Sequence, residues 1–163
     1  MDALADKRDE GMSIDELADW ANANLLFDNH WFFSTTLTYF IRGGRISKTA
    51  GTIGNMLNIC PLMNVNIEGK LIVREKIRSK RKVIKAIVDK MEELARGGLN
   101  YDGKCYISQS ACYEDARAVA DLIEERFPNL DGRVQIYSIG TVIGSHTGPG
   151  TVALFFWGAE RGL

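Results

Sequence analysis

Apolar residues recur every three or four positions near the start of the chain, which is the period of one helix face. The members of this stripe are Ile14, Leu17, Ala18, Ala21 and Leu25. Ser13 precedes the stripe and Glu16 follows three residues later, an arrangement typical of a helical capping box. We therefore expect a helix over residues 14–25. Residues 2–10 are expected to form another helix that ends at Gly11.

The same spacing predicts two longer helices in the middle of the chain. The first spans Ser79–Ala95 and ends at Gly97 and Gly98, and the second spans Tyr113–Phe127 and is stopped by Pro128. Their apolar faces consist of Val83, Ile84, Ile87, Val88, Met91, Leu94, Ala116, Val119, Ala120 and Ile123. Each face is wide enough to pack against a sheet, so both helices are expected to cover a core.

Six segments are rich in β-branched and aromatic residues and are predicted to be strands. They are residues 31–35, 61–67, 70–77, 104–108, 133–139 and 152–157. Only Glu68 and Gly69 separate the second from the third, which is a strong hairpin signal. The last segment is apolar almost throughout, as expected of a strand covered on both faces.

The order of these elements indicates the fold class. Helices and strands are interspersed without a regular strand–helix–strand repeat, and no internal linker divides the chain. We expect a single α+β domain over residues 1–163. It should contain a mostly antiparallel sheet of about six strands, with the helices packed largely on one face.

Composition and charge narrow the class of protein. The chain has 163 residues, of which 45% are hydrophobic and 25% charged, with a net charge of −1. Such a balance is typical of a globular domain and does not favour a nucleic-acid-binding protein, which usually carries a basic excess. No apolar run approaches the length of a membrane span, and the charged N-terminus does not resemble a signal peptide. We therefore expect a cytoplasmic protein and not an integral membrane protein.

The three cysteines agree with that compartment. Cys60, Cys105 and Cys112 are an odd number at irregular spacing, and no CxxC motif occurs. This pattern argues against a disulfide framework. Each cysteine lies in or beside an apolar run, so buried thiols in a reducing environment are expected.

Positive charge is concentrated in residues 74–85, which contain seven basic residues and the single acid Glu75. A solvated helix face and the strand before it explain this pattern most simply. A docking surface for an acidic partner is the alternative, which would make the chain a protein-interaction module.

Two glycine-containing segments are unusual choices for fold alone. In the first, Gly43 and Gly44 are bracketed by Arg42 and Arg45, whose guanidinium groups fit carboxylates or phosphates. The paired glycines allow backbone angles that other residues avoid. A tight turn after a short helix at 37–41 is the plainer interpretation. A further helix is expected over residues 47–57, although Gly51 and Gly54 weaken it.

The second unusual segment is residues 143–151, IGSHTGPGT. Here Ser145, His146 and Thr147 stand within a frame of glycines that ends at Gly148, directly before the apolar strand 152–157. We expect a polar loop beside an apolar wall, which suits a ligand with an anionic head and an oily body. A structural loop with a surface histidine is the alternative.

Other chemistry finds less support in the sequence. His30 is the only other histidine, and no ligand spacing predicts a metal site. The 145–150 segment lacks the GKS or GKT ending of a P-loop, and no GxSxG motif is present. Adjacent residues such as Ser145 and His146 rarely point at one another, so a phosphotransferase or hydrolase that uses the GSHTGPG loop stays an alternative only.

Taken together, the motifs resemble the DegV family of fatty-acid-binding proteins. Residues 37–91 follow the family pattern in which "yLkrGGRI" precedes "lGslLnikPil" and a "dGki…kvR" hairpin. Residues 134–158 are similar to its closing signature, "iGpviGtHtGPGalglaf". The resemblance covers roughly residues 3–160. Each motif alone is moderately specific, and the two at this separation are strong.

The resemblance implies a lipid carrier and not an enzyme. DegV proteins have two domains, and this chain resembles the C-terminal one, so an N-terminal α/β domain is expected as its companion. The family's ligand is a long-chain fatty acid, and no cofactor is implied. Some members present the acid to a fatty acid kinase, which makes an acyl phosphate for phospholipid synthesis.

The resemblance also implies roles for particular residues. His146 matches the position that donates a hydrogen bond to the fatty acid carboxylate, with Ser145, Thr147 and Gly148 beside it. The match to GGRI implies that three residues shape the domain junction; they are Gly43, Gly44 and Arg45. Apolar residues expected to line the acyl chain, or else to be plain core, are Ile53, Met56, Leu57, Leu154 and Phe156.

Overall fold

The computed structural model describes residues 1–47 and 59–162. A six-stranded sheet forms its centre, in the order β3-β2-β1-β6-β4-β5. The strands are β1 (Asp28–Ser34), β2 (Ile59–Val65), β3 (Leu71–Arg78), β4 (Tyr106–Ser110), β5 (Gln135–Ser138) and β6 (Thr151–Trp157). All neighbours pair antiparallel except β4 and β5, which are parallel and joined through α6 (Tyr113–Arg126). The expected α+β class is confirmed, with one strand–helix–strand passage that the sequence did not identify.

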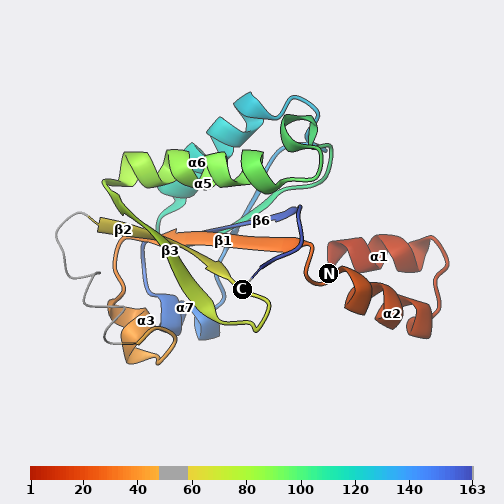
Figure 1. Cartoon of the computed structure of the whole chain (residues 1–163), viewed down its shortest axis with the longest axis horizontal. Coiled ribbons are helices and arrows are strands. Elements are labelled where there is room, and N and C mark those ends of the chain that lie inside the picture. The colour runs from red at the N-terminus through yellow and green to blue at the C-terminus, as the bar shows by residue number, and fades with distance from the viewer. Residues whose placement is uncertain (48–58, 163) are drawn as a thin grey trace.

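Two long helices cover one face of the sheet, α5 (Lys80–Leu94) and α6 (Figure 1). Alternate residues of β1 and β6 face them, because side chains of a strand point to opposite faces in turn. Trp31 and Phe33 from β1 thus join Val152 and Leu154 from β6 in the larger core cluster, with the apolar sides of both helices. Burying each large apolar side chain contributes about 1.5–3 kcal/mol, so this layer dominates the stability of the domain.

The opposite face carries two short helices, α3 (Thr38–Arg42) and α7 (Thr141–Thr147), at one end only (Figure 1). A smaller core lies there, formed by Phe32, Leu37, Phe40, Ile46 and Met63. The rings of Phe32 and Phe40 stack with their centroids 6.1 Å apart. This second cluster fixes α3 against the sheet and so positions the glycine turn that follows it.

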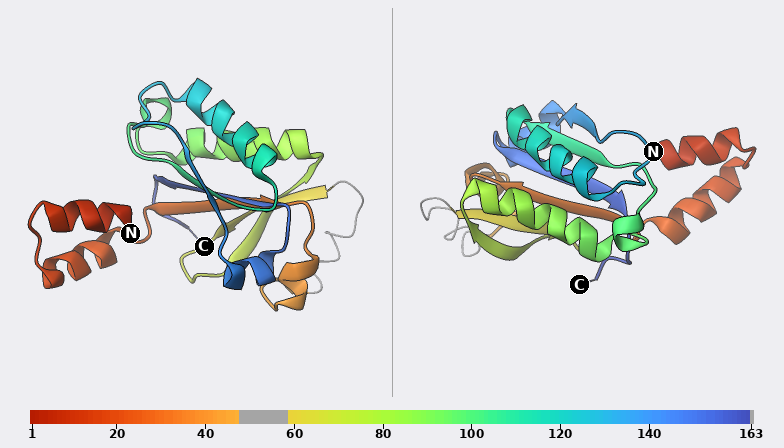
Figure 2. Two further views of the ribbon diagram at one scale, coloured as in Figure 1. Left: turned by 180° about the vertical axis from the view of Figure 1, so that it is seen from behind. Right: turned by 90° about the horizontal axis from the view of Figure 1, so that it is seen from above.

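The N-terminal helices form a hairpin that projects from the edge of the body (Figure 2). They are α1 (Asp2–Asp9) and α2 (Ile14–Asn24), and the predicted capping box between Ser13 and Glu16 is present. The predicted apolar stripe does not become a buried face, however. Neither helix contains a buried residue, and Ile14 is 78% exposed. Trp20 provides one anchor, since its ring meets that of Trp157 edge-on at 5.9 Å.

Most of the predicted elements are found within one to three residues of their expected limits. The β2–β3 hairpin is antiparallel, but its turn is longer than the two residues expected. The side-chain oxygen of Asn66 accepts from the backbone amides of Glu68 and Lys70, which draws residues 66–70 into the turn. A short 3₁₀ helix, Gly98–Asn100, follows α5. The helix expected over residues 47–57 lies almost wholly outside the described residues.

All three cysteines are free thiols. Cys60 and Cys105 are buried, as the sequence predicts, whereas Cys112 is only partly buried. Burial raises the pKa of all three thiols, because the thiolate loses solvation. The three side chains therefore act as small apolar groups and not as reactive nucleophiles.

Candidate functional site

The segment around His146 is a helix and not the loop that the sequence led us to expect. Residues Thr141–Thr147 form α7, which begins after Gly140 in an extended conformation. Gly148 ends the helix with a φ of 70°, and its amide bonds back to the carbonyl of Gly144. Glycine and proline are weak helix formers, which is why their density predicted a loop. Here Gly140 and Gly148 cap the two ends of the helix, and Gly144 lies within it.

The helical geometry brings His146 against the first glycine motif. A methyl group built at Gly43 would lie 2.4 Å from Nδ1 of His146 and 3.1 Å from the carbonyl oxygen of Tyr39. Only glycine leaves room for the imidazole at this position. The GGR turn and the SHTG segment, far apart in the sequence, therefore form one junction between α3 and α7.

Gly148 makes a second close approach in the same junction. Its missing side chain would meet the ring of Tyr39, at 2.1 Å from Cδ2. The positive φ of Gly148 also excludes most other residues. Tyr39 was not among the residues singled out from the sequence. An aromatic residue four positions before Gly43 gives no signal by itself, because its partner is more than a hundred residues away.

Hydroxyl groups collect below this junction, where β1 ends and β6 begins. Thr151 Oγ1 lies 3.1 Å from Ser34 Oγ and 3.3 Å from the carbonyl oxygen of Thr147. The hydroxyl of Thr147 is buried and makes no hydrogen bond within the described residues. Most buried polar atoms in proteins have partners, so the unpaired hydroxyl of Thr147 is an exception.

The remaining predicted polar residues, Ser145 and Arg45, make local hydrogen bonds to backbone carbonyls of their own segments. Ser145 is exposed, and its Oγ donates to the carbonyl of Val142 at 2.7 Å. Arg45 is also exposed and donates to the carbonyl of Gly43 at 2.7 Å. Gly44 supplies a turn with a φ of 70°. The hydrogen bonds of the described residues thus do not join Ser145 to His146 as a nucleophile–base pair.

The apolar candidates fall into two groups. Leu154 and Phe156 are buried in the larger core beneath α5 and α6, so they take the plain core role that the sequence left open for them. Ile53, Met56 and Leu57 lie outside the described residues. Apolar side chains on the α3 face, such as Phe32 and Met63, were not singled out. The alternation within β1 was the signal that could have found Phe32.

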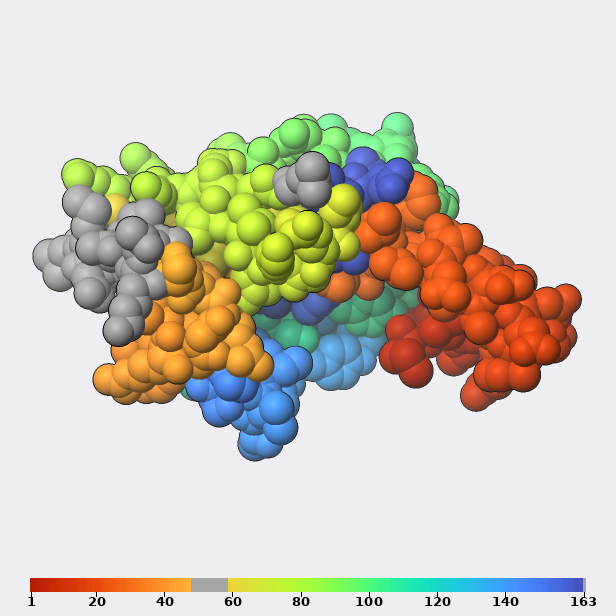
Figure 3. Space-filling view, turned by 60° about the horizontal axis from the view of Figure 1, so that its bottom comes forward, coloured from red at the N-terminus to blue at the C-terminus, as the bar shows by residue number. Residues whose placement is uncertain are grey.

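Apolar side chains are also exposed on the surface of the junction. Val142 and Ile143 on α7 are 76% and 61% exposed, and Tyr39 on α3 is 37% exposed. Figure 3 shows α3 and α7 side by side as a lobe that projects from the body. Exposed apolar residues grouped around a polar histidine suit contact with a further apolar surface.

Other kinds of site find no support in the described part of the chain. No group of three or more potential metal ligands occurs in residues 1–47 and 59–162. Within the same ranges, no helix combines the length and the apolarity that crossing a bilayer requires. His30 pairs with Asp28, with Nε2 and Oδ2 3.0 Å apart, and its ring meets Phe155 edge-on.

Comparison with known proteins identifies the family. Residues 2–158 of the chain match the family model described as "uncharacterised protein, DegV family". The chain belongs to the DegV family. It is 39% identical over 158 residues to a DegV domain-containing protein of Clostridium perfringens, and 32% identical over 149 residues to one of Clostridium acetobutylicum. These alignments cover 96% and 91% of this chain but 53% and 50% of the relatives, so the chain spans about half their length.

Solved structures of the family share the fold. A fatty-acid-binding DegV protein from Streptococcus agalactiae is 27% identical, with a TM-score of 0.77 over 96% of this chain and 54% of its own. The fatty acid kinase B3 protein of Streptococcus pneumoniae, loaded with linoleic acid, has a TM-score of 0.84 at 22% identity. A Eubacterium eligens DegV protein loaded with heptadecanoic acid has the same TM-score at 18% identity. These two cover 96% and 98% of this chain and 53% and 55% of their own.

Proposed function

We propose that the α3–α7 junction binds the carboxylate of a long-chain fatty acid, and that the chain is half of a cytoplasmic lipid carrier. The observation that carries the proposal is the packing of His146 against Gly43, which fixes the imidazole between α3 and α7. The imidazole can donate to carboxylate oxygens, and so can the unpartnered hydroxyl of Thr147 on the next residue. Solved relatives that share this fold are described as loaded with fatty acids.

Affinity and selectivity come from different parts of such a ligand. Burying each methylene group contributes about 0.8 kcal/mol, so a long acyl chain gains on the order of 10 kcal/mol before the costs of association. One hydrogen bond to the charged head adds about 1.5–3 kcal/mol. The apolar wall therefore sets affinity and chain length, while His146 selects acids over alcohols or esters. The exposed apolar lobe suits the second half of such a wall, supplied by a companion domain.

We propose further that the chain carries the fatty acid without transforming it. The presentation of the acid to a fatty acid kinase, for phospholipid synthesis, is supported by the likeness to the pneumococcal fatty acid kinase B3 protein. Ser145 lacks a basic partner in the described hydrogen bonds, which weighs against a hydrolase or phosphotransferase that uses this segment.

The proposal is tested by following the chain's amide resonances during titration with dodecanoate. We expect progressive shifts at Gly43, His146 and Thr147, because the head group lies between α3 and α7. His146→Ala should weaken binding at these resonances about tenfold, the effect of losing one hydrogen bond to a charged group.

His30→Ala is the matched control, since it removes the other histidine from the opposite end of the sheet face. It should leave the response at α3 and α7 unchanged. If His146→Ala retains the wild-type affinity, or if His30→Ala weakens binding as much, the imidazole of His146 does not hold the head group.

A second role has support from charge. Lys76, Arg78, Arg81 and Lys82 are exposed, and none of them forms an ion pair in the described part of the chain. Unpaired charge of one sign at a sheet edge suits the docking of an acidic protein, such as the kinase that a lipid carrier must reach.

A further inference from the structure

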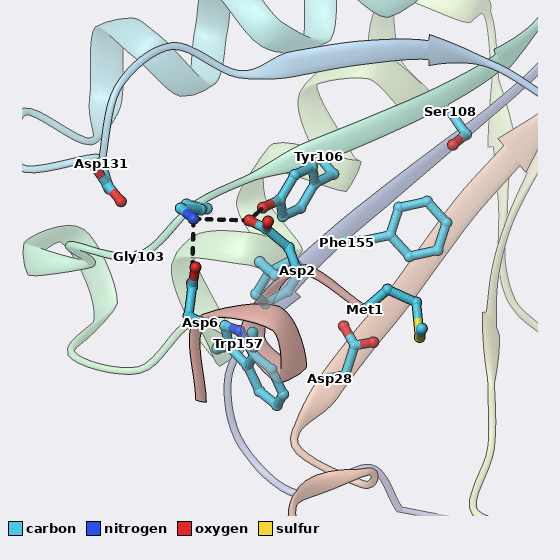
Figure 4. Close-up of a pocket in the computed structure, with 13 residues that line it drawn as sticks. Met1, Asp2, Asp6, Asp28, Gly103, Tyr106, Ser108, Asp131, Phe155 and Trp157 are labelled. Carbon is cyan, nitrogen blue, oxygen red and sulfur yellow. Dashed lines mark hydrogen bonds and ion pairs between the residues drawn. The ribbon is translucent and has the colours of Figure 1, made fainter. Parts of the chain in front are cut away.

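A second carboxylate lies against a cation and a phenol at the other end of the open sheet face. Nζ of Lys104 donates to Oδ2 of Asp2 at 2.8 Å, and the hydroxyl of Tyr106 donates to the same oxygen. Asp6 is a second acceptor for Lys104, at 3.3 Å. Lys104 and Tyr106 belong to the body of the domain, whereas both aspartates belong to α1 (Figure 4).

These hydrogen bonds also shift the pKa values of all three groups. The hydrogen bonds from Lys104 and Tyr106 lower the pKa of Asp2. In turn, Asp2 and Asp6 raise the pKa of Lys104. Burial and the bond to Asp2 raise the pKa of Tyr106, so its phenol keeps the proton that it donates. Each group favours the protonation state that the other requires.

A partly apolar hollow opens directly beside this polar contact. Its volume is about 690 Å³, within the range of ligand pockets. Its apolar lining consists mainly of Met1, Ala3 of α1, and Phe155 and Trp157 of β6. Three further carboxylates also line it, those of Asp6, Asp28 and Asp131 (Figure 4). A head-group contact with a partly apolar hollow beside it thus lies between α1 and the sheet.

The helix that occupies the head-group site is weakly held. No residue of α1 is buried, and the ion pair of Lys104 with Asp2 joins groups that are 35% and 47% exposed. Exposed ion pairs contribute little, because water and salt screen them. An external carboxylate can therefore replace that of Asp2 at Lys104 and Tyr106, while Asp6 still links α1 to Lys104.

We propose that Lys104 and Tyr106 form a second anion site, for a carboxylate amphiphile whose tail enters the hollow, and that Asp2 occupies this site as a built-in competitor. The site is distinct from the α3–α7 junction. His146 precedes the start of β6, whereas Trp157 ends it, about 20 Å away along a seven-residue strand. The inference does not depend on the function proposed above.

If Asp2 competes for the site, replacing it should increase the affinity for a free carboxylate. A purely structural contact would not give this increase. A tethered carboxylate acts at a high effective concentration, so removing it should strengthen the binding of a free one. We expect Asp2→Asn to bind octanoate at least tenfold more tightly than the wild type. The measurement is the shift of the Lys104, Tyr106 and Phe155 amide resonances during titration.

Further variants separate the contributions. Asp9→Asn, which removes an equal charge from the same helix away from Lys104, should leave the wild-type affinity. In the Asp2→Asn background, Lys104→Met should abolish binding and Tyr106→Phe should weaken it. Octanol, with the same tail and no charge, should bind no better to Asp2→Asn than to the wild type.

Three results would overturn the proposal: no gain in affinity for Asp2→Asn, a gain that survives Lys104→Met, or binding of an acidic peptide without binding of octanoate. The last would assign the site to a protein segment. Resonances of Gly43 and Thr147 report on the α3–α7 junction in the same titration. Failure at Lys104 and failure at His146 are therefore distinguishable.

Discussion

The packing of the α3–α7 junction depends on single glycines. The two glycines of the GGR turn are required for different reasons. Gly43 has a φ of −77°, which any residue adopts, but it faces the imidazole of His146. Gly44 has a φ of 70°, and nothing lies within 4 Å of the side chain it lacks. One position is constrained by its neighbour, and the other by its own backbone.

Alanine at Gly43 should therefore affect mainly ligand binding, and alanine at Gly44 mainly the stability of the fold. Gly43→Ala forces His146 out of its place, so we expect the dodecanoate response to fall as far as in His146→Ala, with little change in unfolding free energy. Gly44→Ala should cost about 1–2 kcal/mol of stability through backbone strain, and leave binding near the wild-type level. Urea unfolding and the resonance titration measure the two effects. Equal loss of binding in both variants would mean that the turn acts as one unit.

At the scale of elements, periodicity predicted the parts of the fold that bury a regular face. The helices α5 and α6 were found because their apolar residues repeat along a long stretch, and the β2–β3 hairpin because a turn signal separates two alternating strands. The helix α7 was missed, since five of its seven residues are weak helix formers: Gly144 and the β-branched Thr141, Val142, Ile143 and Thr147. The α2 stripe was misjudged, because periodicity alone does not say whether another surface covers it.

The candidate site shows the same limit. Motif resemblance singled out Gly43 and His146 separately, but a local sequence pattern does not reveal that two distant segments are in contact. Tyr39 and Thr147 take their roles only from that contact. The polar pair of Lys104 with Asp2 was likewise invisible, since each residue alone is an ordinary surface charge.

The element with the clearest surface consequence is the edge strand β3 with the start of α5. Basic residues on an exposed edge also prevent unwanted strand pairing, so their presence alone does not establish docking. If they do guide a kinase, replacing Lys76 and Arg78 by Glu should slow association about tenfold or more in low salt, with a smaller difference at high ionic strength. The measurement is the association rate with a purified fatty acid kinase.

Lys7→Glu with Arg8→Glu is the matched control on α1, because it changes the net charge by the same amount at the other end of the molecule. A rate that falls equally in both double variants would reflect net charge and not a docking surface.

At the scale of the whole molecule, the exposed apolar residues of α3 and α7 and the greater length of the relatives both favour an acyl site completed by a companion domain. The chain spans about half of the relatives that it matches, and α3 and α7 expose Tyr39, Val142 and Ile143 beside His146. If a companion domain supplies the other wall of the acyl site, this chain alone buries only part of the tail. Losing half of a gain on the order of 10 kcal/mol weakens binding by a factor on the order of 10³.

We therefore expect the 163-residue chain to bind oleate weakly, and the twice-longer Clostridium perfringens relative, 39% identical over this region, to bind it far more tightly. Equilibrium dialysis with labelled oleate measures both proteins under one set of conditions. Octanoate provides the internal control: its short tail reaches less of the missing wall, so the difference between the two proteins should shrink with chain length. Tight, stoichiometric binding of oleate by the 163 residues alone would show that the acyl wall is complete within this chain, and that the exposed lobe serves another surface.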